Sequence, residues 1–313
     1  MQHGAGLRLK SMAVGMVRLQ FLGLVLVATF CQGQVPTRGT LVAIVPANRG
    51  IIVAADTRQT VPIDTHLSLL GSVTQTYCDG RTKLFVPKLR KRTVVFQTGN
   101  GLQLPLFGAL PLDICGYLRS TPPILDIANF LVQQVDAKPK QVLTQTEIRE
   151  IAEHCVAEVM EFARKYEAIH PLNQFLGQDM FRGNIVSYDV KHKTGLLGSF
   201  SIRVDSLGTP VVGEVQWHEF WQADKVIKDL FRVGETDYVD QYVLKLGQPS
   251  LGPYNALSTK IVSQTSLSDA TSAALSLITA TEETTKSVTP PHGIGGPIDV
   301  ATITKTGTVL ERH

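Results

Sequence analysis

Several short apolar runs separated by turn residues lie between residues 40 and 97, a pattern typical of β-strands. The runs are rich in β-branched residues, and turns such as Asn48-Arg49-Gly50 separate them. The predicted strands cover residues 40–45, 50–55, 82–86 and 92–97. The chain therefore opens its domain with strands rather than with helices.

Two longer segments that follow carry apolar residues at helical spacing, and they cover residues 124–135 and 146–169. The apolar stripe of the second segment consists of Ile148, Ile151, Ala152, Cys155, Val159 and Phe162. Because each segment is apolar on one side only, we expect two helices that lie on a sheet.

The second half of the chain returns to strand patterns and then to helical ones. The predicted strands are 184–190, 195–204 and 210–215, and the predicted helices are 222–231 and 268–284. Ser268 and Asp269 are the expected N-cap of the last helix, and a closing strand covers 299–304. This element order predicts an α+β or layered αββα domain rather than alternating βαβ units.

Composition fits a globular body. The chain has 313 residues, of which 43% are hydrophobic and 18% charged, so it is long enough to bury a core. Its formal net charge of +3 is too small for the positive field that nucleic-acid binding uses, so we expect no nucleic-acid partner. No Cys/His spacing indicates a metal site, and we expect no cofactor.

Residues 1–33 have the pattern of an export signal, with an apolar run at 19–30 that is too short for a confident membrane span. The positive residues near its start are Arg8, Lys10 and Arg18. Removal of the signal would leave a secreted or periplasmic protein with no membrane attachment. The alternatives are a retained amphiphilic anchor or a later start at Met12 or Met16.

The cysteines beyond the signal are three in number, since Cys31 would be removed with it. They are Cys78, Cys115 and Cys155. An odd number permits at most one bridge within the chain. We expect buried thiols, or one disulfide if the compartment is oxidising.

Gly39 and Thr40 stand directly before the first predicted strand. If the peptide bond between them is cut, the threonine hydroxyl can attack a carbonyl while the freed α-amine accepts the proton. Residues 34–39 are then a short propeptide, and 40–313 form the mature domain. In the alternative interpretation Thr40 simply opens a strand.

The run from Thr40 to Val45, and the second run that ends in Asp56-Thr57-Arg58, resemble the opening of proteasome β-type subunits, with no gap in the spacing. At the far end, 292–301 resembles the family's glycine-rich turn into its last strand. The resemblance implies the four-layer αββα fold of N-terminal-nucleophile (Ntn) hydrolases. It also implies threonine-peptidase chemistry on peptide or other amide bonds and, by analogy, a homo-oligomer.

The same resemblance assigns roles to individual residues. Thr40 would be the nucleophile, and Asp56 would hold Lys83 near it. For this we expect the first two strands to form a hairpin and Lys83 to start a neighbouring strand of the same sheet. A cation there would lower the pKa of the α-amine, which could then act as a base near neutral pH. The backbone N–H of Gly99 would face the developing oxyanion. The supporting neighbours would be Arg58, Gly234 and Asp237.

Other interpretations of these residues stay open. Asp56 can be a carboxylate that caps a strand end, and Lys83 can belong to a solvated basic face together with Lys88. Gly99 can be part of a plain hairpin turn at 98–101.

The chain also departs from the family pattern. Extra residues separate Arg58 from Lys83 and predict a longer loop around 65–78, while an uninterrupted count would put Ser72 at the lysine position. The serines that the family carries near Gly234 are missing as well. The alternative function is therefore a catalytically inactive proteasome-like binding or assembly module. A third possibility is a small-molecule amidase on the same fold, since the fold alone does not determine the substrate.

Overall fold

The computed structural model describes most of the chain from Thr40 onward. The described residues are 36–37, 40–64, 73–99, 101–102, 113–120, 123, 125–138, 142–166, 172–192, 194–222, 225–226, 231–234, 266–286 and 293–313. The expected export signal at 1–33 lies outside them, and so does Gly39 of the expected propeptide. Across these ranges, no helix has both the length and the apolar character needed to cross a membrane.

A five-stranded antiparallel sheet contains the first two predicted strands and the closing one. In spatial order its strands are β13 (Phe231–Gly234), β2 (Leu41–Ala47), β3 (Gly50–Asp56), β14 (Ile298–Thr304) and β15 (Gly307–Arg312). β2 and β3 are buried along their whole length. Both faces of this sheet are therefore covered, which explains why the two strands are continuous apolar runs.

A six-stranded antiparallel sheet contains the strands of the middle of the chain. In spatial order its strands are β12 (Lys225–Val226), β11 (Pro210–Gln222), β10 (Thr194–Val204), β9 (Asp179–Asp189), β7 (Thr93–Gly99) and β6 (Leu84–Phe85). The long strands β9 and β10 form its centre, and β6 is a short edge strand.

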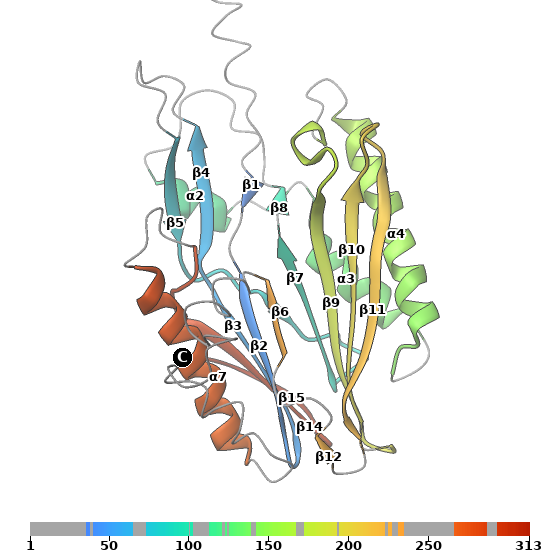
Figure 1. Cartoon of the computed structure of the whole chain (residues 1–313), viewed down its shortest axis with the longest axis vertical. Helices are drawn as coiled ribbons and strands as arrows, with labels where there is room; N and C mark the ends of the chain where they lie inside the picture. Colours follow the sequence, from blue (N-terminus) through green and yellow to red (C-terminus); the bar gives the residue numbers. More distant parts are fainter. Residues whose placement is uncertain are drawn as a thin grey trace, which may run out of the picture.

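Helices cover the outer faces of the two sheets (Figure 1). α3 (Ile127–Asp136) and α4 (Gln145–Lys165) pack on the six-stranded sheet, and α7 (Leu267–Thr285) packs on β2, β3 and β14. α4 begins with a capping box between Thr144 and Glu147. Its predicted apolar stripe is buried at every position, as helical spacing requires for a helix on a sheet.

The inner faces of the two sheets share one apolar cluster. Val42, Ile44 and Val53 of the first sheet pack with Phe96 and Val186 of the second. The alternate residues of β2, such as Leu41 and Ala43, pack outward against α7. This two-residue alternation places each strand residue on a defined side of its sheet. A mixed α+β domain with antiparallel sheets is thus confirmed.

The extra residues after Arg58 form a hairpin of their own rather than a plain loop. β4 (Gln59–Asp64) and β5 (Val73–Cys78) pair with each other in a separate two-stranded sheet. The hairpin projects beyond one end of the five-stranded sheet, beside the short helix α2 (Ile114–Ser120) (Figure 1). Near it, β1 (Pro36–Thr37) pairs with β8 (Gly101–Leu102).

Two sequence predictions are wrong in the second half of the chain. The helix expected at 222–231 is not formed, because Gln222 ends β11, Lys225–Val226 is β12, and Phe231 begins β13. Pairing of Gln222 with Lys225 turns the chain back on itself and extends the sheet instead. Helical spacing over so few residues could not be told from a pair of short strands.

The expected cap of α7 is also displaced. The helix begins at Leu267, and the N-cap is Ser266, whose hydroxyl accepts a hydrogen bond of 3.1 Å from the backbone N–H of Asp269. Ser268 therefore lies inside the first turn. Serine occurs at both positions, so the sequence offered two caps and the structure uses the earlier one.

Candidate active site

The β2–β3 hairpin brings Thr40 and Asp56 to the same end of the five-stranded sheet. The register of the hairpin ends with Val42 opposite Ala55, and Leu41 and Asp56 are the next residues outward on the two strands. The backbone N–H of Leu41 donates a hydrogen bond of 2.7 Å to Asp56 Oδ1. Thr40, one residue earlier, is only 7% exposed. The carboxylate of Asp56 therefore fixes the backbone that carries Thr40.

Lys83 reaches Asp56 from the opposite sheet. Its Nζ lies 3.1 Å from both carboxylate oxygens of Asp56 and also donates a hydrogen bond of 2.6 Å to the backbone carbonyl of Arg58. The exposed fraction is 8% for Lys83 and 0% for Asp56. The interpretation of Lys83 as part of a solvated basic face is therefore wrong.

The expected route of Lys83 to Asp56 is wrong in one respect. We expected Lys83 to start a strand beside the β2–β3 hairpin in the same sheet, but it precedes β6, which belongs to the six-stranded sheet. The two sheets face each other across an apolar cluster. A side chain at the start of β6 can therefore cross the gap between the sheets to reach the end of β3.

Burial governs the protonation of this pair. It raises the pKa of the Asp56 carboxyl, while the Lys83 ammonium and the N–H groups of Leu41 and Gly295 oppose the shift. It also lowers the pKa of Lys83, with the Asp56 carboxylate acting in the opposite direction. Because Asp56 accepts hydrogen bonds from three N–H groups, we describe the pair as carboxylate and ammonium.

Arg58 is the centre of a charge cluster just beyond Asp56. Its Nε and Nη2 donate hydrogen bonds of 2.7 and 3.1 Å to the two carboxylate oxygens of Asp79, and its Nη2 lies 3.4 Å from Glu282 Oε1 on α7. The guanidinium also lies 5.8 Å from the centre of the Tyr77 ring. The cluster ties the start of the β4–β5 hairpin to its end and to α7.

The glycine-rich turn before β14 is shaped by this cluster. Gly295 and Gly296 both have positive φ, 148° and 78°. A Cβ on Gly295 would lie 2.6 Å from Arg58 Nη1, and one on Gly296 would lie 2.9 Å from Asp79 Cγ. The backbone N–H of Gly295 donates to Asp56 Oδ2 at 3.3 Å. Glycine is therefore required here because charged side chains pass directly over the backbone.

The segment that leads to Lys83 is anchored on Thr57, a residue that the sequence did not single out. The Thr57 hydroxyl donates to the carbonyl of Pro297 at 2.6 Å and accepts from the N–H of Gly80 at 3.2 Å. The N–H of Arg81 donates to the Thr57 carbonyl at 3.2 Å. The register of 79–83 against 56–58 is thus set by hydrogen bonds to the hydroxyl and the carbonyl of Thr57.

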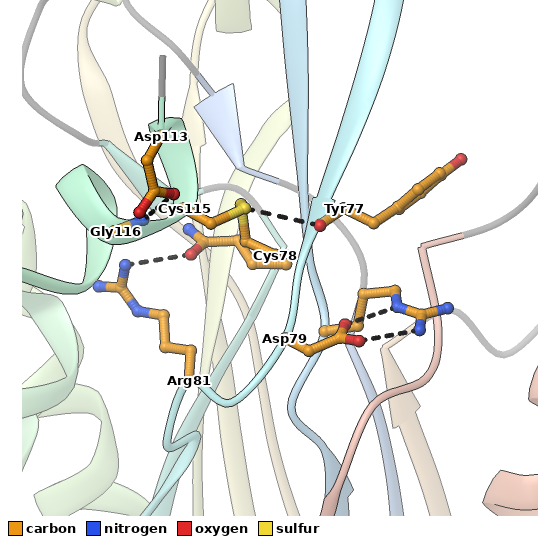
Figure 2. The surroundings of a disulfide bond; sticks show 9 residues. Tyr77, Cys78, Asp79, Arg81, Asp113, Cys115 and Gly116 are labelled. Carbon is orange, nitrogen blue, oxygen red and sulfur yellow. Dashed lines mark hydrogen bonds and ion pairs between the residues drawn. A yellow bond between two sulfur atoms is a disulfide. The ribbon is translucent and has the colours of Figure 1, made fainter. Parts of the chain in front are cut away.

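A disulfide reinforces the same segment. Cys78, at the end of β5, is bonded to Cys115 of α2, and Figure 2 shows Asp79 and Arg81 following directly on the chain. The Arg81 guanidinium donates to Gln59 Oε1 at 3.2 Å. Among the cysteines of the described ranges, Cys155 is free, and it is buried on α4. The one expected bridge is therefore Cys78–Cys115.

Gly234 lies against Thr40 through its backbone. It pairs with Leu41 at the edge of β2, and a Cβ on it would lie 1.9 Å from the carbonyl oxygen of Thr40. The same Cβ would lie 3.6 Å from Cγ2 of Thr98 on β7. Gly234 therefore joins Thr40 to the end of β7. Asp237, the other expected neighbour, lies outside the described residues.

Gly99 ends β7 with a φ of 92°. The hairpin interpretation fails, because β8 pairs with β1 and the strands beside β7 are β6 and β9. Gly99 follows Thr98, the residue beside Gly234, so both glycines belong to the Thr40 end of the sheets. A Cβ on Gly99 would come within 3.1 Å of the Phe181 backbone.

The structure thus gathers Thr40, Asp56, Lys83, Arg58 and Gly234 at one end of the two sheets. Within the described ranges, no group of three or more Asp, Glu, His and Cys side chains could hold a metal ion. No protein-family model matches the chain, and no curated protein matches it in sequence.

Proposed function

We propose that this chain is an exported N-terminal threonine hydrolase that cleaves peptide bonds. It activates itself by cutting between Gly39 and Thr40 and has the four-layer αββα architecture of Ntn hydrolases. The observation that carries the proposal is the contact set of Asp56, which binds the backbone of Leu41 beside Thr40 and the ammonium of Lys83. Two side chains that are distant in sequence, Asp56 and Lys83, thus form a pair at the backbone beside the residue that the resemblance makes the nucleophile.

The fold part of the proposal is supported by the packing of the helices and sheets. α7 lies outside the five-stranded sheet, α3 and α4 lie outside the six-stranded sheet, and an apolar cluster fills the space between the sheets. An αββα arrangement of this kind exposes the ends of facing strands at one edge. Catalytic groups from both sheets can meet there.

The proposed chemistry uses the α-amine that cleavage would release at Thr40. The threonine hydroxyl attacks the substrate carbonyl, and the α-amine takes up its proton. A Lys83 ammonium beside these groups lowers their pKa values by its positive charge, which favours the reactive forms near neutral pH. The backbone N–H of Gly99 would donate to the oxyanion, a contribution of a few kcal/mol, on the order of that measured for single donors elsewhere.

A peptide is the favoured substrate class because of the β1–β8 pairing. Pro36–Thr37, just before the proposed cleavage point, pairs antiparallel with Gly101–Leu102, just after Gly99. An extended segment of the chain itself thus lies along the edge of β8, held by main-chain pairing. A substrate peptide could use the same edge, whereas a small amide could not.

Export is supported by the Cys78–Cys115 disulfide, since such bonds persist in oxidising compartments. The residues 1–33 would supply the signal. A homo-oligomer remains a proposal by family analogy.

The deciding experiment is intact-mass analysis of the full-length protein and of its Thr40→Ala variant after expression with export. The proposal expects the wild-type chain to begin at Thr40 and the variant to keep Gly39. A wild-type chain that retains Gly39 would contradict it, because a blocked threonine has no free amine. That result would favour the inactive binding or assembly module.

A further inference from the structure

A second buried carboxylate lies beside the Asp56–Lys83 pair. Asp299 is on β14, where it pairs with Ala55 of β3, the residue before Asp56. Its neighbours Ala301 and Ile303 at two-residue spacing face the six-stranded sheet, so Asp299 is on the side from which Lys83 enters. The Asp299 side chain is 3% exposed. The Asp299 carboxylate acts electrostatically on Lys83, so carboxylates from two adjacent strands influence one ammonium.

Arg312, near the end of β15, occupies the carboxylate of Asp299. Its Nε donates to Asp299 Oδ1 at 2.7 Å and its Nη2 to Oδ2 at 3.1 Å. This is a two-point contact of the kind that guanidinium groups form with carboxylates.

The same guanidinium reaches the segment that carries Lys83. Arg312 Nη1 donates to the carbonyl of Gly80 at 3.2 Å, and Nη2 donates to Thr82 Oγ1 at 3.1 Å. Thr82 immediately precedes Lys83. Arg312 therefore lies between the second carboxylate and the chain that carries the lysine.

We propose that Arg312 is a positioning residue, which keeps the Lys83 ammonium on Asp56 by occupying the competing carboxylate of Asp299. This inference deepens the proposed function and rests on it for its consequence in catalysis. A lysine that moved toward Asp299 would lose its contacts with Asp56 and the Arg58 carbonyl. It would also leave the end of β2 that carries Thr40.

The charges that face Lys83 come from several elements. They are Asp56 on β3, Asp299 on β14, Asp79 and Arg81 on its own segment, and the α-amine of Thr40 once it is released. Asp299 raises the pKa of Lys83 and Arg81 lowers it. If Arg312 no longer neutralises Asp299, the attraction between Asp299 and Lys83 strengthens and the pKa of Lys83 rises.

The test is Arg312→Ala, with two measurements. The first is the pKa of Lys83, followed by NMR in the full chain that also carries Thr40→Ala and so cannot process itself. The second is the pH profile of self-processing with Thr40 intact. We expect the Lys83 pKa to rise by about one unit and the processing profile to move to higher pH by a similar amount.

The double variant Asp299→Asn with Arg312→Ala separates positioning from anchoring. Because it removes the competing carboxylate, it should return both the Lys83 pKa and the pH profile toward the wild-type values. It also leaves no buried unpaired charge, so it should fold even if Arg312→Ala does not. Arg312→Lys keeps a cation beside Asp299 and should lie near wild type. The matched control is Arg164→Ala, since Arg164 pairs with Glu161 on the exposed face of α4.

Two results would overturn the inference. One is an unchanged Lys83 pKa in Arg312→Ala, and the other is a double variant that behaves like the single one. Either would reduce Arg312 to an anchor of Gly80 and Thr82. A shifted and rescued Lys83 pKa, together with no self-processing of the chain that keeps Thr40, would instead contradict the proposed function and leave the positioning of Lys83 standing.

Discussion

The Lys83 ammonium donates a hydrogen bond of 2.6 Å to the backbone carbonyl of Arg58, in addition to its two contacts with Asp56. Its position therefore depends on the path of the main chain at Arg58 as well as on the acidic side chain. That path is in turn held by the ion pair between Arg58 and Asp79. A perturbation of the β4–β5 hairpin base should accordingly be felt at Lys83.

Replacing Lys83 by alanine should abolish self-processing and also lower the free energy of unfolding by about 3–5 kcal/mol, because Asp56 is left as an unpaired buried carboxylate. Lys88→Ala is the matched control. Lys88 is exposed, and its backbone N–H rather than its side chain binds Asp136. We expect a change within about 0.5 kcal/mol and normal processing. Urea unfolding and intact mass measure both effects. Equal effects of the two substitutions would show that Lys83 is not part of the site.

Gly234→Ala should displace Thr40. The added Cβ would lie 1.9 Å from the Thr40 carbonyl oxygen, so the start of β2 must shift, and a shift of this size should slow processing by about a hundredfold or more. Gly80→Ala serves as the control, because Gly80 also has positive φ but nothing lies within 4 Å of its Cβ position. It should cost only about 1–2 kcal/mol of stability through backbone strain. Similar processing rates in the two variants would show that Thr40 does not depend on Gly234.

The Cys78→Ser variant should lower the free energy of unfolding by about 3–4 kcal/mol, because the bridge to Cys115 closes a long loop, with a sequence separation of 37. Cys155→Ser replaces a buried thiol and tests packing alone. Burial raises the pKa of the Cys155 thiol, so alkylation of the native protein should leave it unmodified. Urea unfolding measures the free energies, and mass spectrometry after alkylation, with and without a dithiol reductant, shows which thiols are free. Modification of Cys78 or Cys115 without reductant would contradict the bridge.

Acid should weaken the hairpin base before it unfolds the core. The hydrogen bonds from Arg58 lower the pKa of Asp79, so the folded state binds this proton less readily than the unfolded state. The stabilisation is fully present above the unfolded pKa, near pH 4, and is lost as pH falls through the lower folded value. Asp79→Asn should remove this part of the acid dependence. Urea unfolding between about pH 2 and 7 measures it, and parallel curves for the two proteins would argue against a linked proton at Asp79.

Several parts of the fold could be predicted because they depend on local pattern. The apolar runs of β2 and β3, with the short turn between them, fixed the hairpin and with it the nearness of Asp56 to Thr40. The buried stripe of α4 followed from helical spacing. Lys83 could be assigned only through the family resemblance, since its approach from the opposite sheet depends on how the two sheets stack.

Other parts depended on long-range pairing that single-sequence patterns do not carry. With three cysteines, nothing in the sequence decides between the pairings, and only the folded chain brings Cys78 to Cys115. The role of Arg312 could not be predicted either, because only the folded chain brings it to Asp299 on the neighbouring strand and to Thr82 beyond the inserted hairpin. The prediction of a helix at 222–231 was wrong because the apolar residues of two short, tightly paired strands can have the same spacing as those of a helix.

The base of the β4–β5 hairpin has a consequence for how this chain can vary in length. Gln59 and Cys78 are paired, and the next residues outward, Arg58 and Asp79, form the ion pair. The excursion through 60–77 therefore leaves and rejoins the body at a single closed point. Segments of other lengths, or a foreign hairpin, could be grafted between Gln59 and Cys78 without moving Lys83. This position is therefore suited to the insertion of engineered sequences.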